Sequence, residues 1–123
     1  MPSPPLAPDD GPIDFEHLQR MTLGDAGLEH EVLAMFAAQS TKLIGTLANL
    51  PKDSGKDSAK DAGALAHTLK GSARAIGAFT VADAAARLEA VLAGGNDPSD
   101  QIAELGEAVA LVRAAIEAVL RRS

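Results

Sequence analysis

The feature that most constrains this chain is the regular spacing of its aliphatic residues near the C-terminus. Between residues 102 and 119, an apolar residue recurs every three or four positions: Ile102, Leu105, Val109, Val112, Ile116 and Val119. This period places all of them on one face of an α-helix. The same spacing occurs at Val32, Phe36, Leu43, Leu47 and Leu50, and again at Val81, Ala84, Ala85, Leu88, Val91 and Leu92. The chain is therefore predicted to be all-α.

Helix-ending residues divide this pattern into segments. Pro51 ends a helix over about 25–50, and the polar stretch 51–58 is predicted to be a loop. A helix from about 58 to 76 ends at Gly77, which is expected to form a left-handed C-terminal cap. Thr80 and Asp83 resemble a capping box that opens the next helix.

The last two boundaries are also glycine and proline signals. The helix that follows Thr80 stops at Gly94 and Gly95, and Asp97 with Pro98 is expected to start the final one. Four helices joined by short connections predict an antiparallel four-helix bundle.

An extra short helix is expected before the bundle. Asp14 is its predicted cap, Phe15, Leu18 and Met21 lie on one side of it, and Gly24 ends it. We expect this helix to cover one end of the bundle. Residues 1–12 contain most of the prolines and are predicted to be a disordered tail, so the domain is assigned to 13–123.

Composition excludes several classes of protein. The chain has 123 residues, the length of one domain, and no cysteine, so disulfides and thiolate chemistry are excluded. A net charge of −6 argues against general nucleic-acid binding. No apolar run is long enough to span a bilayer and no signal peptide is visible, so a cytoplasmic protein without membrane attachment is expected.

One helix carries an unusual group of residues. On a helical wheel with Leu65 at zero, Leu69, Ser72 and Ile76 define the predicted buried side, and His67 lies at about 200°, facing solvent. Lys70, Gly71 and Arg74 lie on the same exposed side.

Each of these residues taken alone could be an ordinary surface residue, but their combination on one face points to a function. Gly71 makes the helix about 1 kcal/mol less stable than alanine would. It leaves a patch without a side chain beside His67. Lys70 and Arg74 make a positive spot on an acidic protein, and such a spot suits a phosphoryl group.

The stretch HTLKGSARAIGA (67–78) closely resembles the signature of histidine-containing phosphotransfer (Hpt) domains. The segment GDAGLEHEVLAMF (24–36) is similar to the opening of that family, and the apolar spacing up to ARLE (86–89) also fits. Together these segments extend the resemblance over roughly residues 13–93, while the final helix is compatible with it.

The resemblance implies a phosphocarrier without kinase activity of its own. His67 would accept a phosphoryl group from an aspartyl phosphate of a receiver domain and pass it on. Lys70 would neutralise the phosphoryl oxygens, Gly71 would keep the docking surface clear, and Arg74 is a candidate second cation. In this family a Glu or Gln often forms a hydrogen bond with the other ring nitrogen of the histidine, and Glu89 lies at the matching position. An ordinary carboxylate at the edge of the core, with no role at the site, explains Glu89 equally well.

Cofactors and partners follow from the same resemblance. No cofactor or metal of its own is expected, and Mg²⁺ would belong to the partner receiver. The partners would be receiver domains of response regulators or of hybrid histidine kinases, with the chain itself a monomer. Relatives with a further cation near position 93 differ from this chain, which has Ala93, so a second cation would come from Arg74, Arg87 or the partner. His17 and His30 are expected to have no function.

Three alternatives stay open at this point. The chain could be a module that binds receivers without accepting phosphate, although it retains the histidine. It could be a structural or oligomerising bundle, which the regular final helix would suit. It could also receive its phosphate in trans from a dimeric kinase.

Overall fold

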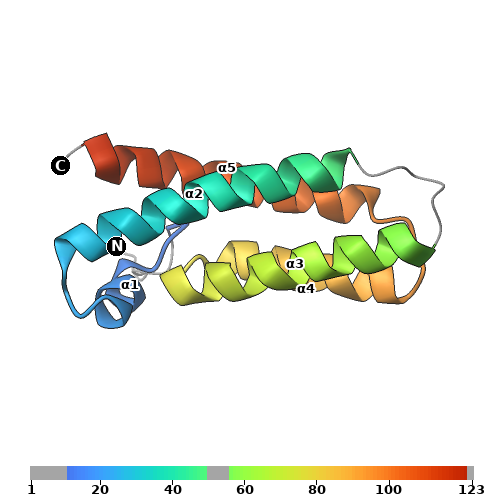
Figure 1. Cartoon of the computed structure of the whole chain (residues 1–123), viewed down its shortest axis with the longest axis horizontal. Helices are drawn as coiled ribbons and strands as arrows, with labels where there is room; N and C mark the ends of the chain where they lie inside the picture. The colour runs from blue at the N-terminus through green and yellow to red at the C-terminus, as the bar shows by residue number, and fades with distance from the viewer. Residues whose placement is uncertain (1–10, 50–55, 122–123) are drawn as a thin grey trace, which may run out of the picture.

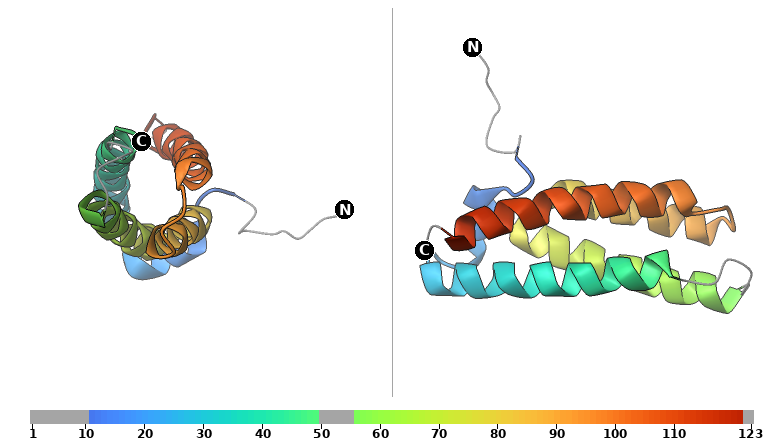
Figure 2. Two further views of the ribbon diagram at one scale, coloured as in Figure 1. Left: turned by 90° about the vertical axis from the view of Figure 1, so that its right-hand side faces the viewer. Right: turned by 90° about the horizontal axis from the view of Figure 1, so that it is seen from above.

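The structure is a computed structural model that describes residues 11–49 and 56–121, with side chains described from Lys60 onward in the second segment. The described residues form five helices and no strand. They are α1 (Phe15–Met21), α2 (Ala26–Ala48), α3 (Lys56–Ile76), α4 (Phe79–Ala93) and α5 (Ser99–Arg121). The long helices α2 to α5 run alternately in opposite directions (Figure 1) and surround one core (Figure 2). The predicted antiparallel four-helix bundle is confirmed.

Helices α1 and α2 each start with a cap that an aspartate provides. The Asp14 carboxylate accepts a hydrogen bond from the backbone N–H of His17 at 3.1 Å, and Asp25 does the same for Leu28 at 3.0 Å. These bonds satisfy N–H groups that have no partner within the helix. The predicted cap at Asp14 is confirmed.

The predicted apolar side of α1 is only partly correct. Leu18 is 1% exposed, whereas Phe15 is 38% and Met21 56% exposed. Three residues spaced by three positions spread over about 120° of a helix, and a seven-residue helix lying on the end of a bundle buries only the middle of that arc. Ile13, just before the helix, is buried together with Leu18.

In α2 the predicted apolar stripe is confirmed in outline. Phe36 and Leu47 are buried, and Val32 and Leu43 are partly buried against the core. Leu50 and the tail 1–10 lie outside the described residues. The pattern missed two buried positions, Leu33 and Ser40. The hydroxyl of Ser40 donates to the Ala37 carbonyl at 3.2 Å, which makes its burial possible.

The turn between α3 and α4 depends on Gly77. This residue has φ +84, as the predicted left-handed cap requires, and the next N–H, of Ala78, donates to the Ala73 carbonyl at 2.8 Å. The Gly77 carbonyl accepts from the N–H of Asp14 at 2.9 Å, which attaches the segment before α1 to this turn. A Cβ at position 77 would lie 2.6 Å from the Asp14 carbonyl oxygen, so a larger residue fits only if this backbone shifts.

The predicted capping box of Thr80 and Asp83 is wrong. Helix α4 begins at Phe79, its N-cap residue is Ala78, and no side chain caps it. Because the Gly77 turn leads directly into α4, Thr80 already lies inside the helix. The apolar face is as expected, with Val81, Ala84, Ala85 and Leu88 buried and Val91 and Leu92 partly buried.

The buried residues of α5 confirm the predicted apolar face of this helix. Leu105, Val109, Val112 and Ile116 are buried, and Ile102 and Val119 are partly buried against the core. At its start, the Asp97 carboxylate accepts from the N–H of Ser99 at 3.1 Å and from its hydroxyl at 2.7 Å, with Pro98 between them.

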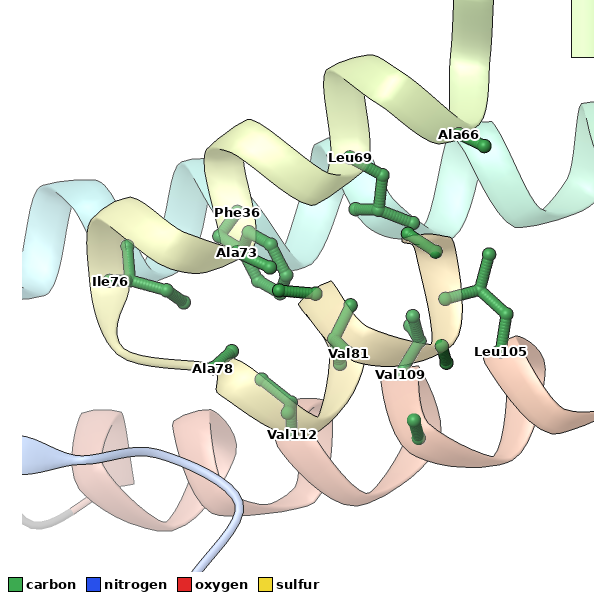
Figure 3. Packing of buried hydrophobic residues seen from close by; sticks show 14 of the residues in the cluster. Phe36, Ala66, Leu69, Ala73, Ile76, Ala78, Val81, Leu105, Val109 and Val112 are labelled. Carbon is green, nitrogen blue, oxygen red and sulfur yellow. The ribbon is translucent and has the colours of Figure 1, made fainter. Parts of the chain in front are cut away.

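Alanine dominates the contact between α3 and α4. Ala66 and Ala73 in α3, with Ala84 and Ala85 in α4, have no exposed surface at all. Leu69, Ile76 and Val81 pack beside them, and Phe36, Leu105, Val109 and Val112 lie in the same cluster (Figure 3). Small residues let two helix backbones approach closely, which brings polar side chains at the edges of α3 and α4 within reach of each other.

Within the described part of the chain, every helix is too short or too polar to cross a bilayer.

Candidate functional site

Helix α3 is rotated relative to the sequence prediction. Its buried residues are Ala62, Ala66, Leu69, Ala73 and Ile76, whereas Leu65 and Ser72 are only partly buried. The centre of the buried face is therefore shifted by roughly 50° from the predicted one. The inward-facing alanines cause this shift, because close packing against α4 buries them in place of the larger Leu65.

The rotation separates residues that the wheel grouped together. His67 remains on the outside and its side chain is 71% exposed, as predicted. Lys70 moves toward α4, and its side chain is only 19% exposed. Lys70 thus lies beside His67, as predicted, but it is mostly buried against α4.

Glu89 of α4 joins these two α3 residues. Its Oε2 lies 3.2 Å from Nδ1 of His67, and its Oε1 lies 2.6 Å from Nζ of Lys70. The Glu89 side chain is itself only 27% exposed. One carboxylate thus contacts an imidazole and an ammonium, and we call these three residues the His67–Glu89–Lys70 cluster.

The charge state of Glu89 follows from its neighbours. The hydrogen bond from the Lys70 ammonium is the main cause that lowers the pKa of Glu89 below its usual value. Partial burial opposes this shift, while the positive charge of Lys70 and the hydrogen bond with His67 add to it. Glu89 is therefore an ionised carboxylate at neutral pH.

An ionised carboxylate only accepts hydrogen bonds, and this determines the state of the ring. In the His67–Glu89 contact Nδ1 must carry the hydrogen. A neutral imidazole with hydrogen on Nδ1 has its free lone pair on Nε2. The cluster thus favours a His67 side chain whose Nε2 is an exposed nucleophile.

Arg74 and Gly71 occupy the same side of α3. Gly71 is exposed, and no atom outside its own stretch of helix lies within 4 Å of where a Cβ would stand. Arg74 is exposed and forms no ion pair within the described part of the chain. It lies seven residues, or about two helical turns, after His67 and therefore on the same side of α3.

Arg87 does not serve as a free cation. Its guanidinium binds both carboxylate oxygens of Glu104 in α5, with Nη2–Oε2 at 2.7 Å and Nε at 3.1 Å from each oxygen. Arg87 also lies two residues from Glu89, which corresponds to about 200° around α4. The expectation of Arg87 as a source of the second cation is therefore corrected: Arg87 joins α4 to α5.

The other histidines lie in different surroundings. The ring of His17 contacts that of Phe79 edge-on, with centroids 5.2 Å apart, and its Nε2 is buried without a hydrogen-bond partner among the described residues. His30 is half-buried in α2. Among the residues that the structure describes, no three His, Asp or Glu side chains gather as a metal site would require.

The sequence did not indicate that Lys70 binds Glu89. The two residues are nineteen positions apart on different helices. The signal available was the row Ala62, Ala66, Ala73, whose spacing of four and seven matches a close helix contact and would have turned Lys70 toward α4.

Comparison with known proteins adds an independent result. The profile of the Hpt domain matches residues 31–122, which includes α3, α4 and α5 in full and α2 from residue 31 onward. The match extends beyond the segment 13–93 on which the resemblance was based, while α1 lies outside it. Searches of curated proteins and of solved structures gave no match. Since the profile spans most of the chain and includes the helix that carries His67, the chain belongs to the Hpt domain family.

Proposed function

We propose that this Hpt domain carries a phosphoryl group on Nε2 of His67 between aspartates of receiver domains. Hpt domains are phosphocarriers of two-component signalling and not kinases, and they interact with receiver domains. The observation that carries the proposal is the His67–Glu89 contact: an exposed ring whose Nδ1 is bound to a carboxylate and whose Nε2 is free.

The transfer step follows from this arrangement. The Nε2 lone pair of neutral His67 attacks the phosphorus of an aspartyl phosphate, and the P–O bond to the aspartyl carboxyl breaks. The aspartate leaves as a carboxylate, and the new N–P bond gives the imidazole ring a positive charge while Nδ1 keeps its hydrogen. The Glu89 carboxylate, 3.2 Å away, stabilises that developing charge.

The two cations of α3 have different roles in this proposal. Lys70 acts through Glu89: their ion pair keeps the carboxylate ionised and in place beside the ring. Arg74 has no such partner and is the cation available for the oxygens of the phosphoryl group. Mg²⁺ would be held by the receiver, which also provides the aspartate, so this chain supplies positioning and charge.

The test is labelling by a phosphorylated receiver domain, with each receiver of the host cell tried in turn. The wild-type protein should acquire an acid-labile, base-stable phosphate, His67→Gln should acquire none, and Arg74→Gln should acquire it more slowly. His30→Gln is the matched control and should behave as wild type. Labelling that persists in His67→Gln, or the failure of every receiver to label the wild type, would contradict the proposal. Labelling only by a kinase would indicate the alternative donor.

A further inference from the structure

The connection between α1 and α2, residues 22–25, contains a strained residue. Leu23 has φ +55 and is the only residue other than glycine with a positive φ in the part of the chain that the structure describes. The left-handed conformation is unfavourable for leucine because its Cβ crowds the following carbonyl oxygen. The Leu23 side chain is 92% exposed, so no packing of that side chain compensates for the strain. The strain is therefore a cost of the short connection itself.

Helix α1 is held on the bundle by residues that are far from it in the sequence. The N–H of Asp14 donates to the Gly77 carbonyl at 2.9 Å, and the ring of His17 lies edge-on to that of Phe79, with centroids 5.2 Å apart. Leu18 is 1% exposed, and α1 packs against α3. A helix of seven residues is not stable in isolation, so α1 must dock to remain folded. The surface on which it docks is also present in every other copy of the chain.

The connection 22–25 has a second conformation open to it, because its sequence TLGD contains no proline. If these four residues were helical, α1 and α2 would form one continuous helix over 15–48, and Leu23 and Gly24 would both leave the left-handed region. In a continuous helix, α1 would point away from its own bundle and could not reach its own Gly77 turn. A short connection under strain is the feature that favours exchange of an element between copies.

We propose that two copies of this chain exchange α1, so that each α1 docks at Gly77 and Phe79 of the other copy and the two form a domain-swapped dimer. The exchange is symmetric, fills both docking surfaces and reproduces every contact that α1 makes with α3 and α4. The monomer expected from the resemblance is then the closed form, and the dimer is favoured by high protein concentration. Gly77 follows His67 by ten residues, so both copies keep the His67–Glu89–Lys70 cluster, and the inference does not depend on the proposed function.

The first test uses the wild-type chain. Equal amounts of ¹³C-labelled and unlabelled protein are mixed in urea, refolded at high concentration and separated by size-exclusion chromatography with light scattering. The dimer fraction is then examined by isotope-filtered NMR, which detects nuclear Overhauser effects (NOEs) only between a labelled and an unlabelled chain. The rings of His17 and Phe79 are close enough for an NOE, so the swapped dimer should give this signal between chains.

The second test changes the connection in opposite directions and measures the dimerisation constant. Gly24→Ala should strengthen dimerisation by about tenfold or more, because alanine is strained at φ +75 in the closed form and favours the helix. Leu23→Gly should weaken it by a similar factor, because glycine removes the strain and disfavours the helix. Gly95→Ala adds the same strain in the turn after α4, also in open space, and should leave dimerisation unchanged. Met21→Gln removes an exposed apolar side chain beside the connection and should also have no effect.

Three results would overturn the inference. One is the absence of any dimer in both the wild type and Gly24→Ala. Another is a dimer that gives no NOE between His17 of one chain and Phe79 of the other. The third is a dimer that Met21→Gln abolishes and Gly24→Ala leaves unchanged, which would indicate contact between apolar surfaces without exchange of α1.

Discussion

In the proposed function, Glu89 is the residue on which the chemistry of His67 depends most directly. Its carboxylate contacts both Nδ1 of the ring and the ammonium of Lys70. A carboxylate that orients a histidine and stabilises its charged form is worth orders of magnitude in reactions where the ring gains a proton or a substituent. In the proposed function, Glu89 is thus a positioning residue.

Replacing Glu89 by glutamine should slow phosphoryl transfer to His67. The amide cannot stabilise the positive ring as a carboxylate does, and it no longer balances the charge of Lys70, so we expect a loss of roughly ten- to hundredfold. Single-turnover labelling by a phosphorylated receiver measures the rate. Glu107→Gln, an exposed change on α5, is the control and should leave the rate unchanged. Equal rates for Glu89→Gln and the wild type would contradict the assigned role.

The lowered pKa of Glu89 predicts how stability depends on pH. A carboxyl whose pKa is lower in the folded state than in the unfolded state stabilises the fold above the unfolded value, and this contribution is lost as the pH falls through the folded one. The wild type should therefore be more stable than Glu89→Gln at pH 7, and the difference should shrink on acidification below about pH 4.5. Urea unfolding of both proteins at pH 7 and pH 3 measures it. A difference that grows at low pH would have the wrong sign.

At the scale of the helices, the closeness of α3 and α4 determines whether the cluster forms. The residues between them include Ala66, Ala73 and Ala85, all without exposed surface. Because these side chains are small, Glu89 on one helix reaches His67 and Lys70 on the other. The site is therefore a consequence of alanine packing.

A larger side chain between α3 and α4 should both destabilise the bundle and disturb the His67–Glu89–Lys70 cluster. Ala73→Leu adds volume where none is free, and overpacking of this kind lowers the free energy of unfolding by about 1–3 kcal/mol. Ala75→Leu is the matched control on the exposed side of the same helix and should change it by less than about 0.5 kcal/mol. Urea unfolding measures both variants, and equal effects would show that the interface is not closely packed.

The helices differ in how far their boundaries and buried faces could be predicted from the sequence. The apolar face of α5, the cap at Asp14 and the turn at Gly77 were predictable because each depends on residues near in sequence. The start of α4 was not, because Thr80 and Asp83 form a valid capping pattern that the Gly77 turn makes unnecessary. The exposure of His67 was predictable, but the Lys70–Glu89 pair depends on how two helices rotate against each other.

At the scale of the whole molecule, Gly77 connects three elements. It ends α3, leads into α4 and accepts a hydrogen bond from Asp14, the residue that caps α1. The first helix is therefore attached to the end of the bundle through the backbone of this one turn, in addition to the buried side chains of Ile13 and Leu18. The segment at Asp14, before α2, is thus in contact with the Gly77 turn, which follows α3.

Gly77→Ala should destabilise the protein more than Gly95→Ala. Both glycines have positive φ, +84 and +73, so alanine is strained at either position by about 1 kcal/mol. Only at position 77 does a Cβ also meet backbone, at 2.6 Å from the Asp14 carbonyl oxygen, while at position 95 nothing lies within 4 Å. Thermal unfolding measures the two variants, and equal melting temperatures would show that the Asp14 contact contributes nothing.

In the proposed function, Nε2 of His67 carries the phosphate because Glu89 holds the hydrogen on Nδ1. The most direct measurement is a long-range ¹H–¹⁵N NMR spectrum of the histidine rings, recorded before and after phosphorylation by a receiver. We expect the free His67 ring to be protonated at Nδ1 and the phosphorylated ring to be substituted at Nε2. A phosphate on Nδ1, or a free ring protonated at Nε2, would contradict it.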